Sequence, residues 1–278
     1  MTFPPEWHAL GREAALAGEQ LATGVTALGR ANHAQKGLYN QAFFALSIGL
    51  ERLAKLILVA DHAIENDGAW LTDQALRTIG HDIVALLNAC DPISQKYAAS
   101  EQWCQRPASP IHIAIVVRLS EFAKLTRYYN LASLSGGKAA QLIEPIAGWW
   151  NEVGKPILDH HYSANQRAKD EAQAALMGSL MDGFATVLHH NEAGQSMTSI
   201  EAMMTRAGST RVVQRYGRLY VMQLIRWLST TISEISHKAA YERRIEALLG
   251  LNEPFRIFYN EDRYLLGRKT WSIYRLGR

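Results

Sequence analysis

The sequence predicts an all-α protein built as a multi-helix bundle, and three observations lead to this prediction. Apolar residues return at helical spacing along most of the chain. Runs that alternate between apolar and polar residues, as half-buried strands do, are nearly absent. Hydrophobic residues make up 48% and charged residues 20% of the 278 positions, which is typical of a chain that buries a sizeable core. We therefore expect helix to exceed about 60% of the residues, roughly twice the usual share.

The first half of the chain is predicted to hold five helices separated by turn-forming residues. In the second helix, apolar residues fall on one face. We expect this face to be buried against the fourth and fifth helices, and its residues are Leu46, Leu50, Leu53 and Ile57. A run of Glu, Asn, Asp and Gly at 65–68 ends this helix, and Pro92 is expected to end a later one. The five expected helices are 6–30, 38–62, 71–78, 81–90 and 111–134.

The second half is predicted to be helical as far as a basic tail. A helix over 138–161 is expected to be interrupted at Pro145 and Pro156, and a long helix is expected over 165–190. Thr198 and Glu201 form a Thr-x-x-Glu capping box, which predicts the start of a short helix. One long helix or two stacked helices are expected over 209–249. The tail, 254–278, is aromatic and basic without helical period, so a short hairpin or an extended arm is expected there.

Two units are predicted along the chain. The first is a front helical bundle over 1–135, and the second is a C-terminal helical unit with a basic tail over 138–278. Ser135, Gly136 and Gly137 mark the junction, because such residues favour loops. The sequence leaves open whether the two units are separate or share one core.

The charge distribution predicts an anionic partner. The formal net charge is +3, but residues 206–278 hold 14 Lys or Arg and 6 Asp or Glu, so they carry +8 and the rest of the chain carries −5. A basic C-terminal third favours RNA, or it docks onto the acidic front of the same chain. Near-helical spacing also predicts a stripe of phosphate contacts, with a solvated or internally paired face as the alternative; its residues are Arg211, Arg215, Arg218 and Arg226.

Composition and motifs exclude several other classes of protein. The most apolar stretch, 42–60, carries three charged residues, so no membrane span is expected. No signal peptide is recognised and the chain has two cysteines, so we expect a cytoplasmic protein with Cys90 and Cys104 as free thiols. Neither Gly-x-x-x-x-Gly-Lys-Ser/Thr nor Gly-x-Gly-x-x-Gly occurs, and no cofactor is predicted.

Histidine positions do not predict a metal site. A Glu-x-x-His pair at Glu234 and His237 lacks the second copy that a di-iron bundle needs. The His160-His161 and His189-His190 pairs are expected to end helices, where the helix dipole favours histidine. A metal site that uses these histidines with Asp159 or Glu192 is the alternative.

One stretch of the chain resembles a known family. From Gln41 the sequence reads QAFFALSIGLERLAKLILV, and after a variable loop it reads GHDIVALLN up to Asn88. This order is similar to HEPN domains, in which a helix with a Glu-Lys-x-x-Lys core precedes a His-Asp-Leu helix. The matching positions are Glu51, Arg52 and Lys55, then His81, Asp82 and Ile83.

A later run, Arg127-Tyr128-Tyr129-Asn130, is similar to the Ala-Arg-Tyr-Pro turn that often ends a later HEPN helix. The resemblance covers roughly residues 35–135. It implies a polar network that includes Glu51, Lys55, Asp82 and Arg127. From the residues alone, Glu51 and Lys55 can pair on one helical face, enter a buried network or face a dimer interface, and Asp82 can simply cap a helix.

The resemblance also implies a candidate activity. HEPN ribonucleases share an Arg-x4–6-His motif that meets its copy across a homodimer and needs no metal. A histidine can move the 2′-hydroxyl proton while an arginine stabilises charge on the phosphate. Arg106 and His112 have this spacing, although two prolines lie between them, and Arg77 and His81 are one position too close.

Two functions remain open from the sequence. The leading hypothesis is a HEPN-like protein that binds or cleaves RNA as a homodimer, in a prokaryotic antiviral defence or toxin–antitoxin system. A metal-independent ribonuclease with a degenerate motif is the candidate enzyme. The alternative is a noncatalytic helical scaffold or regulatory subunit whose basic third binds a protein partner.

Overall fold

The computed structural model describes residues 3–134, 141–181, 184–185 and 187–274. Helices of all kinds account for 73% of the described residues, and the strands found among them are two residues long each. The prediction of an all-α bundle is therefore confirmed. The predicted junction at 135–137 lies outside the described residues.

The first two helices form an antiparallel pair. Helix α1 spans Pro5–Leu28 and α2 spans Gly37–Glu65. The two helices approach closely because each presents a glycine to a leucine of the other. A Cβ atom at Gly24 would lie 2.6 Å from Cγ of Leu46, and one at Gly49 would lie 2.7 Å from Cγ of Leu21. The leucines thus fill the space that the missing side chains leave.

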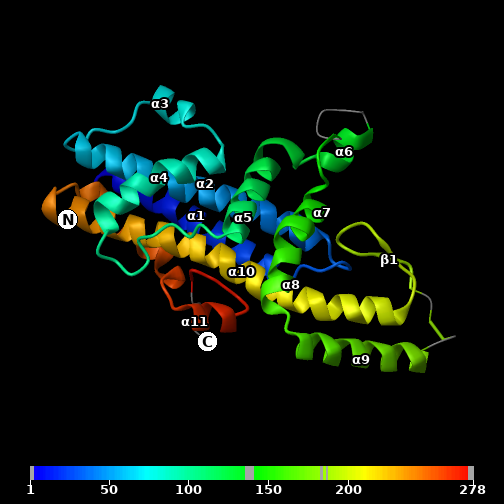
Figure 1. The fold of residues 1–278 in the computed structure, drawn as a ribbon. Helices are drawn as coiled ribbons and strands as arrows, with labels where there is room; N and C mark the ends of the chain where they lie inside the picture. Colours follow the sequence, from blue (N-terminus) through cyan, green and yellow to red (C-terminus); the bar gives the residue numbers. More distant parts are fainter. Residues whose placement is uncertain (1–2, 135–140, 182–183, 186, 275–278) are drawn as a thin grey trace.

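The elements of the rest of the front half are α3 (Asp73–Thr78), α4 (Ile83–Ala98), α5 (Pro110–Glu121), the π-helical turn η1 (Phe122–Thr126) and α6 (Tyr129–Leu134). Of these, α4 and α5 pack against α2, whereas α3 and α6 lie away from the α1–α2 pair (Figure 1). The prediction that Pro92 ends a helix is wrong, because α4 continues through it for six more residues. Ile93 and Ser94 beyond the proline are buried, and this packing outweighs the lost backbone hydrogen bond.

Pro156 does not break its helix either. Helix α7 (Pro145–Trp149), the π-helical turn η3 (Trp150–Gly154) and α8 (Lys155–His161) follow one another without a gap. A proline lacks the N–H that an α-helical turn needs and clashes with the preceding carbonyl. The wider π turn directly before Pro156 absorbs both defects. His160 and His161 end α8, as predicted.

The segment after α9 (Ala164–Met181) was predicted to be helical up to His190, and this is wrong. Instead β1 (His189–His190) pairs with β2 (Ser196–Met197) in an antiparallel hairpin. Asn191 explains the reversal, because its side-chain oxygen accepts hydrogen bonds from the backbone N–H groups of Ala193 and Gln195. Gly194 completes the turn with φ +81°.

The central helix, α10, spans Ile200–His237 and continues as the π-helical turn η4 (Lys238–Glu242). The short helix predicted to start at Thr198 and the helix predicted from residue 209 are therefore one continuous helix. Its cap is Ser199, whose side chain accepts from the Ala202 N–H, so the predicted capping box at Thr198 is wrong by one residue. In Figure 1, α9 lies beside the first half of α10.

The tail is not an extended arm. It forms the 3-10 turns η5 (Glu246–Leu248) and η6 (Glu253–Phe258) and helix α11 (Asp262–Gly267). Four of its large apolar side chains are buried; they are Phe255, Phe258, Leu265 and Trp271. The tail therefore returns to the bundle and packs on α1 and α10.

One cluster of buried side chains runs from Ala14 in α1 to Trp271 in the tail and includes α10. The face of α2 predicted to be buried is fully buried, since Leu46, Leu50, Leu53 and Ile57 each have 0% exposure. Leu46 packs against Gly24 of α1. Among the described residues, no helix is both long and apolar enough to cross a bilayer.

Candidate functional site

The structure gives His112 a structural position instead of a catalytic one. The side chain is 6% exposed. Its Nε2 lies 2.9 Å from Oε1 of Gln223 in α10, and its Nδ1 lies 2.7 Å from the Ser109 hydroxyl. With a carboxamide oxygen accepting from Nε2, Nδ1 is left to accept from the hydroxyl. Burial lowers the pKa of the ring, so the neutral imidazole joins α5 to α10.

Arg106 contacts other side chains than His112 does. It donates a hydrogen bond to Oδ1 of Asn88 at 2.6 Å, and its guanidinium lies 5.7 Å from the centre of the Trp227 ring. These partners, Trp227 and Gln223, lie one turn apart on α10, but the histidine is buried and has both ring nitrogens engaged. A catalytic role for the pair stays a prediction.

The second candidate pair is also divided between different partners. Arg77 forms an exposed ion pair with Asp73, one turn earlier, at 2.8 Å. His81 places Nδ1 2.8 Å from Oε1 of Glu51. Nothing in this arrangement brings the guanidinium and the imidazole to one phosphate.

The predicted polar network exists in part. Oε1 of Glu51 accepts from Lys55 Nζ at 2.8 Å and also contacts His81, so these three residues link α2 to the start of α4. Asp82 forms a separate cluster. It caps α4 through the Val84 N–H, and it accepts from Lys124 Nζ at 2.7 Å.

The hydrogen bond from Lys124 is the main reason that the pKa of Asp82 lies below its usual value. Ser120 adds a further hydrogen bond to the same carboxylate. Arg127 belongs to neither cluster. Its guanidinium lies 5.1 Å from the centre of the Phe44 ring, so its assignment to the network is corrected.

Two members of the predicted arginine stripe hold the tail. Arg218 is 3% exposed and donates to the backbone oxygen of Leu266 at 3.1 Å. Arg226 is 7% exposed and pairs with Asp262 at 2.9 Å. Neither guanidinium is available to a phosphate, so their assignment to nucleic-acid binding is corrected.

The other two stripe residues face solvent. Arg211 pairs with Asp170 of α9 at 3.0 Å, with its side chain 65% exposed. Arg215 is exposed, and its guanidinium lies 5.6 Å from the centre of the Tyr216 ring. The alternative of an internally paired face therefore describes three of the four arginines, since Arg211, Arg218 and Arg226 each have a partner within the chain.

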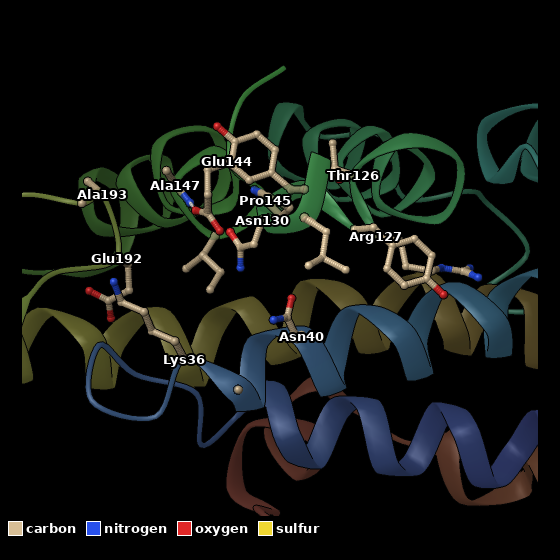
Figure 2. Close-up of a pocket in the computed structure, with 16 residues that line it drawn as sticks. Lys36, Asn40, Thr126, Arg127, Asn130, Glu144, Pro145, Ala147, Glu192 and Ala193 are labelled. Carbon is tan, nitrogen blue, oxygen red and sulfur yellow. Dashed lines mark hydrogen bonds between the residues drawn. The ribbon is translucent and has the colours of Figure 1, made fainter. Parts of the chain in front are cut away.

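A cleft of about 620 Å³ lies between the start of α2, the η1–α6 turn, the start of α7 and the tip of the β-hairpin. This size falls in the range of small-ligand pockets. Figure 2 shows Lys36, directly before α2, and Asn40 on α2 forming the floor, with Asn130 and Glu144 facing them from the opposite wall. The cleft thus joins segments from both predicted units.

Two cations stand at opposite ends of this cleft (Figure 2). Lys36 reaches toward the wall formed by Glu192 and Ala193, and Arg127 extends along α2 at the other end. Within the described ranges neither forms an ion pair. The Nε–H group of Arg127 is buried and has no hydrogen-bond partner in the structure.

The two carboxylates in the cleft wall are already engaged. Glu144 caps α7 by accepting from the Ala147 N–H at 2.7 Å. The Glu192 side chain is fully buried and pairs with Nε of Arg206 at 2.6 Å. Of the two, only Glu192 is neutralised by a paired cation, and Glu144 keeps its charge beside the start of α7.

The Glu192–Arg206 pair holds the hairpin in place. The Arg206 guanidinium lies 3.3 Å from the centre of the Trp150 ring, and Thr210 donates to the other oxygen of Glu192 at 3.3 Å. Burial lowers the pKa of Arg206, and Glu192 opposes that shift. The hairpin side of the cleft is therefore fixed by a buried network.

Comparison with protein-family models, with curated proteins and with solved structures found no match. In the described part of the chain, no three His, Cys, Asp or Glu side chains gather in a way that could hold a metal ion. The cleft and its neighbouring network are thus the features from which a function can be argued.

Sequence reasoning did not identify the cleft. The sequence predicts a family-like turn at 127–130, and it offers Glu192 only as a possible metal ligand. Lys36 and Asn40 lie four residues apart on α2, but nothing in a linear sequence indicates that residues near 130, 145 and 192 cover them. A lysine followed one helical turn later by an asparagine, as at Lys36 and Asn40, is too common a pattern to predict a binding site.

Proposed function

We propose that this chain is a noncatalytic, HEPN-like RNA-binding module that holds a single-stranded segment in the α2–α6 cleft. The observation that carries the proposal is the pair of cations, Lys36 and Arg127, that stand without acidic partners at the two ends of an aromatic-lined cleft. Proteins that bind single strands combine a positive groove with aromatic side chains that stack on bases.

The spacing of the cations fits a strand better than a lone phosphate. Arg127 lies on Phe44, which is eight residues after Lys36 on the same helix. Eight residues of α-helix rise about 12 Å. A single phosphate cannot reach both ends, whereas an extended chain can place one phosphate at each.

The aromatic side chains of the cleft can stack on bases. Tyr128 is 66% exposed and Tyr129 also lines the cleft. A base stacked on such a ring contributes on the order of 1–3 kcal/mol. Because every base has a flat face, this contribution is independent of sequence.

Binding without cleavage is supported by the positions of the candidate catalytic residues. His112 has both ring nitrogens engaged and is buried. His81 contacts Glu51, and no arginine of the described residues is paired with it. A general base must reach the proton that it removes, and neither histidine faces the cleft residues.

A protein partner is the second candidate, and one observation favours it. Leu176 and Leu180 lie one turn apart on α9 and are 59% and 61% exposed. Large exposed apolar groups often mark an interaction surface. A second copy of this chain, as in a homodimer, would give a larger particle in light scattering without RNA.

The test of RNA binding uses a labelled single-stranded RNA and its fluorescence anisotropy at several salt concentrations. We expect Lys36→Gln and Arg127→Gln each to weaken binding and to flatten the log–log salt dependence by about 0.7. Arg12→Gln is the matched control. This variant removes an exposed cation that lies far from the cleft. Arg12 is next to Glu13, and Glu13 pairs with Arg52. Arg52 lies about 24 Å along α2 from Lys36.

The same protein is incubated with RNA in EDTA to test cleavage. We expect intact RNA with the wild type. Absence of binding at low salt, or an equal loss in Arg12→Gln, would contradict the cleft as the site. Cleavage that disappears in His112→Ala would instead restore the nuclease.

A further inference from the structure

Asn40 and Asn130 face each other across the cleft. Figure 2 shows Asn40 on α2 pointing up from the floor and Asn130 of α6 pointing down toward it. Both side chains are exposed, and in the described part of the structure neither carboxamide forms a hydrogen bond.

The two amides also lie midway between the cations. Lys36, Asn40 and Phe44 follow at four-residue intervals, so they share one face of α2 at steps of about 6 Å. Arg127 lies over Phe44. A strand with phosphates at Lys36 and Arg127 therefore brings a base between them, at the level of the amides.

The chemistry of the amides restricts which base fits. A carboxamide offers one donor side and one acceptor side, and it pairs in a bidentate manner with an edge that offers an acceptor beside a donor. Cytosine, uracil and guanine each have such a combination on the Watson–Crick edge. Guanine has a second such edge on its sugar side, where its amino group lies beside N3, whereas a pyrimidine has no second edge with a donor beside an acceptor.

Adenine also has two such edges, because its amino group has two hydrogens and lies between N1 and N7. Two facing amides can therefore hold both edges of a purine together. We infer that Asn40 and Asn130 form a purine-reading pair, which makes the cleft selective for purines over pyrimidines in single-stranded RNA. This inference rests on the proposed RNA-binding function and names the class of base that it prefers.

The test compares four labelled single-stranded RNA oligomers by anisotropy under one salt condition. Three are homo-oligomers of adenine, cytosine or uracil, and the fourth contains guanine. We expect the wild type to bind the adenine oligomer at least about ten-fold more tightly than the uracil oligomer. Asn40→Leu and Asn130→Leu should each reduce that ratio toward one while changing affinity for uracil by less than about three-fold. Arg127→Gln should weaken all four in parallel and keep the ratio.

Asn151→Leu is the matched control, since it exchanges an exposed asparagine of η3 that is not among the cleft residues. Circular dichroism checks that each variant is folded. Equal affinity for adenine and uracil, or a preference that survives both leucine variants, would overturn the purine-reading pair while cation-dependent binding still supports the proposed function. If no oligomer binds at low salt, both proposals are refuted.

Discussion

At the scale of single residues, burial decides what a polar side chain can do. His112 was a candidate base by spacing, yet its 6% exposure and two hydrogen bonds leave it as a link between α5 and α10. Arg218 and Arg226 were candidate phosphate ligands, yet they hold the tail. Sequence spacing predicts which residues share a helical face, but it does not indicate which part of the chain will cover that face.

His112 should make stability depend on pH. Burial lowers its pKa in the folded state, so below about pH 6.5 the unfolded chain binds more protons than the folded chain. The free energy of unfolding should therefore fall as pH drops below that value, until the folded pKa is passed. One such proton contributes at most about 1.4 kcal/mol per pH unit.

Urea unfolding of His112→Gln at about pH 7 and about pH 5 measures this contribution. We expect the variant to lose less stability on acidification than the wild type. His33 and His161 also have lowered pKa values because of burial, so some pH dependence should remain. Exposed His8→Gln is the control, and an identical slope in His112→Gln and wild type would refute the assignment.

At the scale of elements, the helices were more predictable than their ends and interruptions. The apolar face of α2 was identified correctly from helical periodicity. Pro92 and Pro156 were expected to break helices, but buried residues after the first and a π turn before the second keep the chain helical. Such compensation depends on tertiary packing, which periodicity does not contain.

The α1–α2 contact gives a prediction with an internal control. A Cβ atom at Gly49 would lie 2.7 Å from Leu21, so Gly49→Ala should force the helices apart and cost about 1–3 kcal/mol. Gly11, also within a helix, has nothing within 4 Å of its Cβ position. Gly11→Ala should instead stabilise by about 0.5–1 kcal/mol through helix propensity.

Thermal and urea unfolding of the two variants compare these effects directly. The opposite signs are the diagnostic result, because both substitutions add the same methyl group to a helix. A stabilising Gly49→Ala would mean that α1 and α2 are not packed as closely as the glycine positions require.

At the scale of the whole molecule, α10 connects features that the sequence assigned to different units. Its side chains Leu224, Ile225 and Leu228 belong to the same buried cluster as α1 and α2. Trp227 donates to the hydroxyl of Ser94 in α4 at 3.0 Å. The cleft likewise combines α2 with the hairpin near Glu192. These long-range contacts explain why the helices could be predicted from local patterns and the site could not.

The shared cluster predicts that residues 1–134 do not fold alone. Without α10, the faces of α1, α2 and α4 that now contact it would expose apolar side chains to water, and each large one contributes about 1.5–3 kcal/mol when buried. Since a domain is stable by only about 5–15 kcal/mol, losing several such contacts should abolish cooperative folding.

We expect the fragment 1–134 to lack a cooperative melting transition. The full chain should unfold in one transition, followed both by circular dichroism and by tryptophan fluorescence. Adding 141–278 as a separate chain should restore the transition if the missing contacts are the cause. A sharp melting transition of 1–134 by itself would show instead that the front half is an independent domain, and that α10 docks onto a bundle that is already formed.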